Sequence, residues 1–333
     1  MIPFSILDLS QVVEGGTVEK SFRNTARMAK AAEDAGYLRY WLAEHHGMPA
    51  VASSATSVLI GHVGHATSKI RIGSGGIMLP NHAPLVIAEQ FGTLAALFPG
   101  RVDLGLGRAP GTDMRTARAL RRDLEAGAHT FPNDILELQR LFGPVEDGQQ
   151  ILAMPGVNSN VPIWLLGSSL YSAHLAAALG LPYAFASHFA PDALMDAIAI
   201  YRERFQPSAQ LEKPYVMAGI MGVVADTDAE AKYHFTSAQL QFINLRRNTR
   251  GYFPKPVESM DEHWTESERY NVEHTLQYAI VGSPKTAERD LADFIRVTGI
   301  DELIISMPIS DVDARLRSIE LFAGLDTIVR KAA

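Results

Sequence analysis

The chain has 333 residues, 47% hydrophobic and 20% charged, which is the balance of a folded protein and excludes long disorder. A formal charge of −7 without a basic stripe argues against nucleic acid as a partner. The sequence contains no cysteine, so disulfides, thiolate metal sites and a cysteine nucleophile are excluded. It has neither a signal peptide nor a run of roughly 20 apolar residues, and we therefore expect a cytoplasmic protein with no membrane association.

Short apolar runs alternate with segments of helical spacing along the chain, a pattern typical of repeated strand and helix units. The predicted strands are residues 2–9, 40–43, 70–74, 102–106, 163–166, 183–187, 216–224 and 303–307. A helix is expected after each strand, the first over residues 17–35 with Gly36 at its C-terminal end. This alternation predicts an α/β fold with a parallel sheet, and eight units favour closure into a (β/α)8, or TIM, barrel.

Two segments interrupt the alternation: residues 107–154, after the fourth strand, and residues 248–271, after the seventh strand and its helix. Both are candidate lids over an active site. The second is polar and contains Gly and Pro without clear periodicity, which fits a mobile loop or a simple connector. No boundary divides the chain, so we predict a single domain over residues 1–333.

In a parallel barrel the active site lies at the C-terminal ends of the strands, so the residues that follow each strand are the candidates. Glu44, His45 and His46 follow the second strand and offer a carboxylate beside two imidazoles that titrate near neutrality. They could act in catalysis, or they could cap a helix. A zinc site is less well supported, because adjacent histidines diverge and no third ligand lies nearby in sequence.

A glycine-rich segment, residues 73–80, follows the third strand and includes Ser74, Gly75 and Gly76. Missing side chains would let its backbone approach a flat ligand, although an ordinary tight turn is the alternative. Arg108 follows the fourth strand among further glycines, where its planar fork of donors could hold an anion or form a surface ion pair.

Small hydroxyl residues follow the fifth strand, where Gly167, Ser168, Ser169 and Ser172 open a predicted helix that ends near Gly180. Free N–H groups and the positive end of the helix dipole at such a start suit a phosphate, although simple capping by serine is the alternative. The segment has neither the lysine of a P-loop nor the glycine spacing of a dinucleotide fold, so a single terminal phosphate fits best.

Together these segments resemble the bacterial luciferase-like family of flavin-dependent monooxygenases over essentially the whole chain. The matching segments are residues 40–46, 73–80, 88–90, 99–101 with 107–108, and 167–172. The resemblance implies a (β/α)8 barrel with the flavin ring at its C-terminal mouth. It also implies reduced FMN supplied by a separate flavin reductase, with O2 and a small organic molecule as substrates.

The resemblance also assigns roles to residues. His45 matches the catalytic histidine of the family, with Glu44 and His46 around it, and Arg108 matches the arginine that reaches the flavin phosphate. The other implied cofactor contacts are Gly167, Ser168, Ser169 and Ser172 at the phosphate, and Ser74, Gly75, Gly76, Ser187 and His188 at the ring. The Gly75–Gly76 peptide matches a cis bond beneath the ring. Ser168 stands where the luciferases carry a glutamate.

The family's dimer, formed through the helices after strands two and three, implies a homodimer here, and residues 51–67 are rich in Ala, Ser and Gly. The alternatives are hydride transfer with the deazaflavin F420, a flavin-binding protein without chemistry, and a metal hydrolase, although we expect no bound metal. The acidic tail of F420 would need basic residues such as Arg121 with Arg122 or Arg246 with Arg247, but charged pairs are more often solvated helix faces.

Overall fold

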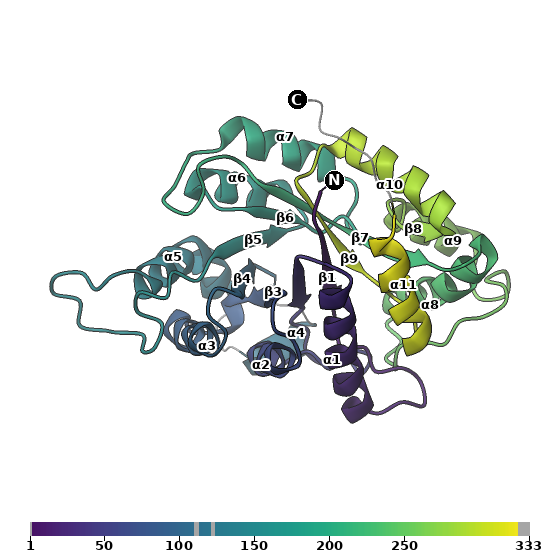
Figure 1. Cartoon of the computed structure of the whole chain (residues 1–333), viewed down its shortest axis with the longest axis horizontal. Coiled ribbons are helices and arrows are strands. Elements are labelled where there is room, and N and C mark those ends of the chain that lie inside the picture. Colours follow the sequence, from purple (N-terminus) through teal and green to yellow (C-terminus); the bar gives the residue numbers. More distant parts are fainter. Residues whose placement is uncertain (1, 110–112, 121–123, 326–333) are drawn as a thin grey trace.

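The computed structural model describes residues 2–109, 113–120 and 124–325, in which helices surround a set of parallel strands (Figure 1). Eight strands form the barrel: β1 (Phe4–Asp8), β2 (Arg39–Leu42), β3 (Arg71–Met78), β4 (Val102–Gly107), β5 (Ile163–Gly167), β6 (Tyr183–Phe185), β7 (Val216–Val224) and β9 (Glu302–Ser306). They pair in the order β6-β5-β4-β3-β2-β1-β9-β7, and pairing of β6 with β7 closes the ring. The predicted (β/α)8 barrel is confirmed.

Helices cover the barrel because each turns an apolar face to the strands. They are α1 (Val18–Asp34), α2 (Thr56–Ala66), α3 (Pro84–Leu97), α4 (Met114–Leu120), α5 (Leu124–Phe142), α6 (Leu170–Leu179), α7 (Leu194–Arg204), α8 (Asp228–Arg246), α9 (Glu266–Thr275), α10 (Pro284–Thr298) and α11 (Val312–Ala323), with a short 3-10 turn, η1 (Leu79–Asn81). Thr17 begins α1 by accepting a hydrogen bond from the Lys20 N–H, and Gly180 ends α6 with a left-handed φ of 61°. Within the described parts of the chain, no helix combines the length and apolar character needed to cross a membrane.

The third strand differs from its prediction. β3 continues to Met78 instead of ending at residue 74, so the tight turn expected over residues 73–80 is wrong. The Gly75–Gly76 peptide bond is cis, as the family resemblance implied, and it lies inside the strand. The pairing of β3 with β4 shifts its register between Ser74 and Ile77, on either side of that bond. The glycines thus form part of the barrel wall.

A ninth strand, β8 (Ile280–Gly282), was not predicted from the sequence. It pairs in parallel with the last three residues of β7, Gly222–Val224, and β7 pairs with β9 through its earlier residues, Met217–Met221. The sequence analysis identified only the eight strands of the barrel and did not recognise this short run as a strand. β7 therefore belongs both to the barrel and to a small outer ladder.

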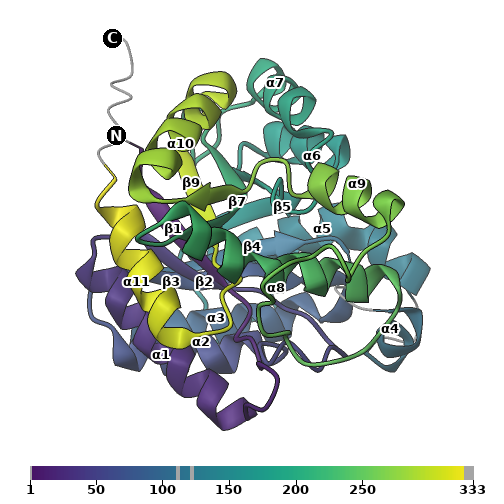
Figure 2. The same ribbon diagram turned by 90° about the vertical axis from the view of Figure 1, so that its right-hand side faces the viewer.

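The two insertions differ in character. The first insertion contains α4 and α5. Helix α5 buries Phe131, Ile135 and Leu138 and packs on α3, so α5 is one of the helices that surround the barrel and not a lid. The second is irregular up to the start of α9, as predicted. Its Phe253 and Met260 are buried, so it is packed on the protein. Figure 2 shows α8, α9 and this segment facing the viewer.

Candidate active site

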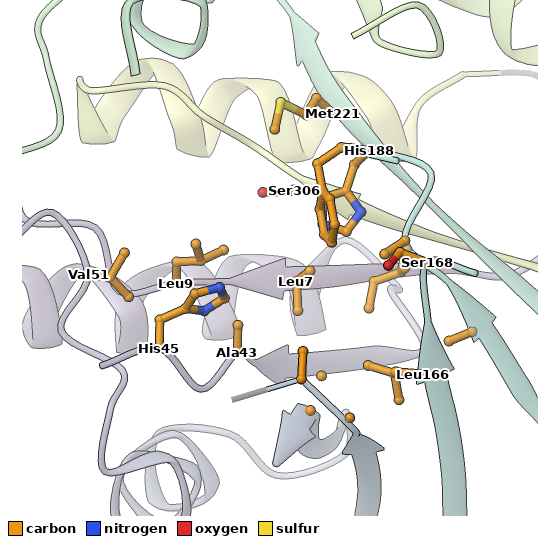
Figure 3. A pocket seen from close by; sticks show the side chains of 18 of the residues that line it. Leu7, Leu9, Ala43, His45, Val51, Leu166, Ser168, His188, Met221 and Ser306 are labelled. Atoms are coloured by element: carbon orange, nitrogen blue, oxygen red, sulfur yellow. The ribbon is translucent and has the colours of Figure 1, made fainter. Parts of the chain in front are cut away.

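A cavity of about 710 Å³ lies at the C-terminal ends of the barrel strands, where active sites of parallel barrels are found. Its size suits a small-molecule or cofactor site. Most of its walls are apolar and come from the strand ends, α8 and the segment after α8, among them Leu7, Leu9, Trp41, Ala43, Met217, Met221, Phe242 and Ile304. Figure 3 shows part of this lining. A ligand in this cavity would be largely shielded from water.

Two imidazoles reach this cavity from different elements, His45 from the segment after β2 and His188 from the segment after β6 (Figure 3). The Nδ1 atom of each ring is buried and makes no hydrogen bond with the described residues. Burial lowers the pKa of His45 below its usual value of 6.5. Burial, together with the nearby His45, also lowers the pKa of His188, to about 4. Both rings are therefore neutral at pH 7, and both residues line the cavity.

Glu44 and His46, the sequence neighbours of His45, do not line the cavity. The carboxylate of Glu44 is buried and accepts hydrogen bonds from His46 Nε2 at 2.7 Å, His82 Nε2 at 2.9 Å and the Met78 N–H at 3.0 Å. Burial by itself would raise the pKa of Glu44, but these donors outweigh it and lower the pKa to about 2. Glu44 thus ties the ends of β2 and β3 together and positions the backbone on either side of His45.

The Glu44→Gln variant should show how much the Glu44 carboxylate contributes to the stability of the fold. Because the folded pKa of Glu44, about 2, lies below the ordinary 4.5, the carboxylate stabilises the fold above pH 4.5, and this contribution is lost as the pH falls through 2. The shift corresponds to about 3 kcal/mol. Urea denaturation should therefore find the variant less stable than wild type at pH 7, with the gap narrowing towards pH 3. A gap of equal size at both pH values would contradict this, and Glu262→Gln, at an exposed glutamate, serves as the control.

A candidate anion site lies where β4 and β5 end side by side. The Arg108 guanidinium sits 3.9 Å from the ring centroid of Tyr171 in the first turn of α6. Ser169 caps α6 without a side-chain hydrogen bond, and Ser168 beside it is exposed, so neither hydroxyl occupies the helix start. The Ser172 hydroxyl bonds to the Ser169 carbonyl at 3.1 Å. A guanidinium over an uncapped helix N-terminus offers the donors and positive potential that a terminal phosphate requires.

Two predicted glycine positions, Gly75 and Gly76, line the cavity, and the protein itself requires glycine at both. A Cβ at Gly75 would lie 2.7 Å from Leu7 Cδ1, and one at Gly76 would lie 2.7 Å from the Gly105 carbonyl oxygen. Gly167 is equally constrained, because a Cβ there would meet the Ser172 hydroxyl at 1.7 Å. Close strand packing therefore brings bare backbone to the cavity wall.

Two predicted serines, Ser74 and Ser187, do not line the cavity. The Ser74 hydroxyl donates to the Gly105 carbonyl at 2.9 Å and joins β3 to β4 at the register shift. The Ser187 hydroxyl donates to the Gly219 carbonyl at 2.7 Å and joins the end of β6 to β7. Their hydrogen bonds hold neighbouring strands together.

The wall formed by α8 was not anticipated from the sequence. Its lining residues are Ala238, Gln241, Phe242, Leu245 and Arg246. Arg246 and Arg247, expected to lie together on a solvated helix face, point in different directions. Arg247 Nε binds Glu268 at 2.7 Å, whereas Arg246 lines the cavity. Arg121 and Arg122 lie outside the described residues. A helix that lines a cavity on one face carries no sequence motif, and only its spacing of three and four residues could have indicated that face.

Among the described residues, no group of three or more His, Asp or Glu side chains is arranged to hold a metal ion. Residues 2–302 match the family described as luciferase-like monooxygenase. The chain belongs to this family. It is 50% identical over 320 residues to a luciferase-like monooxygenase of Escherichia coli strain K12, with 96% of each chain covered. It is 51% identical over 322 residues to YvbT of Bacillus subtilis, again with 96% of each covered.

More distant relatives carry specific names. An N-acetyl-S-alkylcysteine monooxygenase of Bacillus subtilis is 31% identical to this family member, with 97% of this chain and 98% of the relative covered. The crystal structure of apo-MsnO8 has a TM-score of 0.86 and 32% identity, with 97% and 98% covered.

Two structures share only the fold with this family member. The oxygenating constituent of 3,6-diketocamphane monooxygenase of Pseudomonas putida, in complex with FMN, has a TM-score of 0.73 and 17% identity, with 98% of this chain and 97% of that chain covered. An F420-dependent secondary alcohol dehydrogenase has a TM-score of 0.67 and 15% identity, with 97% and 98% covered.

Proposed function

We propose that this protein is a monooxygenase that uses reduced FMN and O2 to oxidise a small organic substrate. The observation that carries the proposal is the pairing of a one-phosphate site with a deep apolar cavity. Arg108, stacked on Tyr171 over the uncapped start of α6, suits the single phosphate of FMN. The adjoining cavity of about 710 Å³ has Gly75 and Gly76 in its wall and is large enough for an isoalloxazine ring.

FMN, when bound in reduced form, would supply the redox chemistry with O2. Arg108 and the α6 N-terminus would bind and orient it, and the apolar walls would exclude water from the reacting centre. Neutral His45, which lines the cavity, would donate or hold a proton at the flavin ring, and neutral His188 would face the same space. Glu44 would act on this chemistry only through the backbone that it positions.

Known relatives support this choice of cofactor and reaction. The relative named for oxygenation of N-acetyl-S-alkylcysteine and the FMN complex with the same fold both favour oxygen chemistry on flavin. The F420-dependent neighbour makes F420 the second candidate. Arg246 lines the cavity and favours this candidate, because the acidic tail of F420 needs a cation. We further propose that a separate reductase supplies the reduced FMN.

Anaerobic titration with FMN, reduced FMN and F420, followed by mixing with O2, tests this function. We expect reduced FMN to bind and to be reoxidised by O2 at a rate different from that of free flavin. His45→Ala should keep flavin affinity and change that rate by about 100-fold or more, the usual effect of losing a positioned proton donor. His129→Ala, at an exposed position of α5, is the control. Binding of F420 alone would contradict the proposal, and reoxidation at the rate of free flavin would indicate mere flavin binding.

We also propose that two copies associate through α2 and α3, as the family resemblance implies. These helices expose apolar side chains: Val58 is 70% exposed, Val86 44% and Leu97 56%. Gly64 does not contribute to such contact, because it makes room for Phe98 of its own chain, whose ring would lie 2.5 Å from an added Cβ. Light scattering should return twice the 36.3 kDa of one chain, and the mass of a single chain would contradict the dimer.

A further inference from the structure

One face of α8 runs from the buried part of the cavity to its mouth. Ala238 is buried, Gln241 and Phe242 are half-buried, and Leu245 and Arg246 are exposed, yet all five line the same cavity. From the first to the last of these residues the helix rises about 12 Å. The wall is therefore graded, apolar at its inner end and cationic at its outer end.

The cation at the mouth is not neutralised by the protein. Arg108 and Arg246 are the two arginines of the described lining, which contains no lysine, aspartate or glutamate. Arg246 Nη2 donates to the Asn271 carbonyl at 3.3 Å and to the Thr275 hydroxyl at 3.0 Å, and no ion pair joins it to a carboxylate of the described residues. Neutral acceptors thus fix the guanidinium and leave its charge available.

A helix dipole accounts for a cation in the last turn of α8 without any ligand. The neighbouring Arg247 already fills that role, and its charge is paired with Glu268. Only Arg246 is directed to the cavity. Arg246 is the last residue of α8 and Arg247 is its C-cap, so both lie at the negative end of the helix dipole. The dipole therefore does not explain why only Arg246 lines the cavity.

We propose that Arg246 binds an acidic group of the organic substrate, so that the substrate is an amphipathic carboxylate with an apolar body. This rests on the proposed function, because Arg108 on the β4 and α6 side is assigned to the flavin phosphate. α8 packs on β7, β8 and α9, so Arg246 reaches the cavity from different elements than Arg108 does. The carboxylate would stay at the mouth while the apolar end reaches into the cavity towards His45 and the flavin ring. Oxidation would then take place at the end of the substrate remote from its acid group.

Calorimetric titration of the FMN complex with decanoate and with decan-1-ol tests this assignment. The two probes share one alkyl chain and differ in charge. We expect wild type to bind decanoate about fivefold more tightly, since an exposed charge pair is worth on the order of 1 kcal/mol. Arg246→Ala should abolish that preference, Arg246→Lys should retain part of it, and Arg247→Ala should leave it unchanged.

Equal affinity of wild type for the two probes, or a preference that survives in Arg246→Ala, would overturn the proposal. The proposal would also be overturned if Arg246→Ala bound decanoate and riboflavin as wild type does but bound FMN more weakly. Arg246 would then bind the flavin phosphate. The same titrations on flavin-free protein separate this question from the proposed function. A decanoate preference there that Arg246→Ala abolishes would support the Arg246 site even if FMN failed to bind.

Discussion

Replacing Arg108 with alanine should weaken FMN binding by about 10- to 100-fold, because a hydrogen bond to a charged group contributes roughly 1.5–3 kcal/mol. The guanidinium is held over the Tyr171 ring at 3.9 Å, next to the first turn of α6. No other lysine or arginine comes from this side of the described lining. Fluorescence titration with FMN measures the loss directly.

Riboflavin is the decisive comparison, because it lacks the phosphate. Arg108→Ala should bind riboflavin as wild type does, and Arg108→Lys should fall between the two for FMN, since lysine keeps the charge and loses the planar fork. Arg296→Ala, on the exposed face of α10, should bind FMN normally. If Arg108→Ala weakened riboflavin as much as FMN, Arg108 would be supporting the cavity and not the phosphate.

The barrel could be predicted from the sequence because its strands are buried on both sides and read as apolar runs. The prediction failed where that signal is absent. β8 has three residues, and β3 continues through two glycines, Gly75 and Gly76, that look like a turn. Only the packing against Leu7 and the Gly105 carbonyl explains why glycine is required there within a strand.

The candidate site was predicted less completely, because sequence order does not reveal which way a side chain points after a strand ends. Of the consecutive residues Glu44, His45 and His46, only His45 faces the cavity. Arg108 and the α6 start could be predicted because a cation and a helix start are visible as residue types. Arg246 could not, because its neighbour Arg247 has the same charge and a different direction.

A second large effect is expected on stability, at the opposite end of the barrel from the cavity. Arg39 at the start of β2 binds two buried carboxylates, Glu302 through Nε at 2.9 Å and Asp103 through Nη1 at 2.7 Å. Arg71 also binds Asp103, at 2.5 Å. The other hydrogen-bond partners of Glu302 among the described residues are hydroxyls, one of them from Tyr215 at 2.9 Å. Arg39 is thus the only cation of the described residues that pairs with Glu302.

Arg39→Ala should lower the free energy of unfolding by about 3–5 kcal/mol, because it leaves a buried carboxylate without its counter-charge. Burial raises the pKa of Glu302, and the charge of Arg39 opposes that rise. Without Arg39 the folded variant would bind a proton at higher pH than the unfolded chain does, so the loss should be largest near pH 8 and smaller near pH 5.

Urea denaturation of wild type and Arg39→Ala at these two pH values checks both the size and the direction of the effect. Arg23→Ala is the matched control, because its pair with Glu19 is exposed and should be worth less than about 1 kcal/mol at either pH. Adding Glu302→Gln to Arg39→Ala should recover part of the loss at pH 8, since the neutral amide needs no counter-charge. A loss of unfolding free energy under 1 kcal/mol, or one that grows as the pH falls, would contradict this prediction. It would show that water reaches Glu302 and that the N-terminal end of the barrel does not depend on the pair of Arg39 with Glu302.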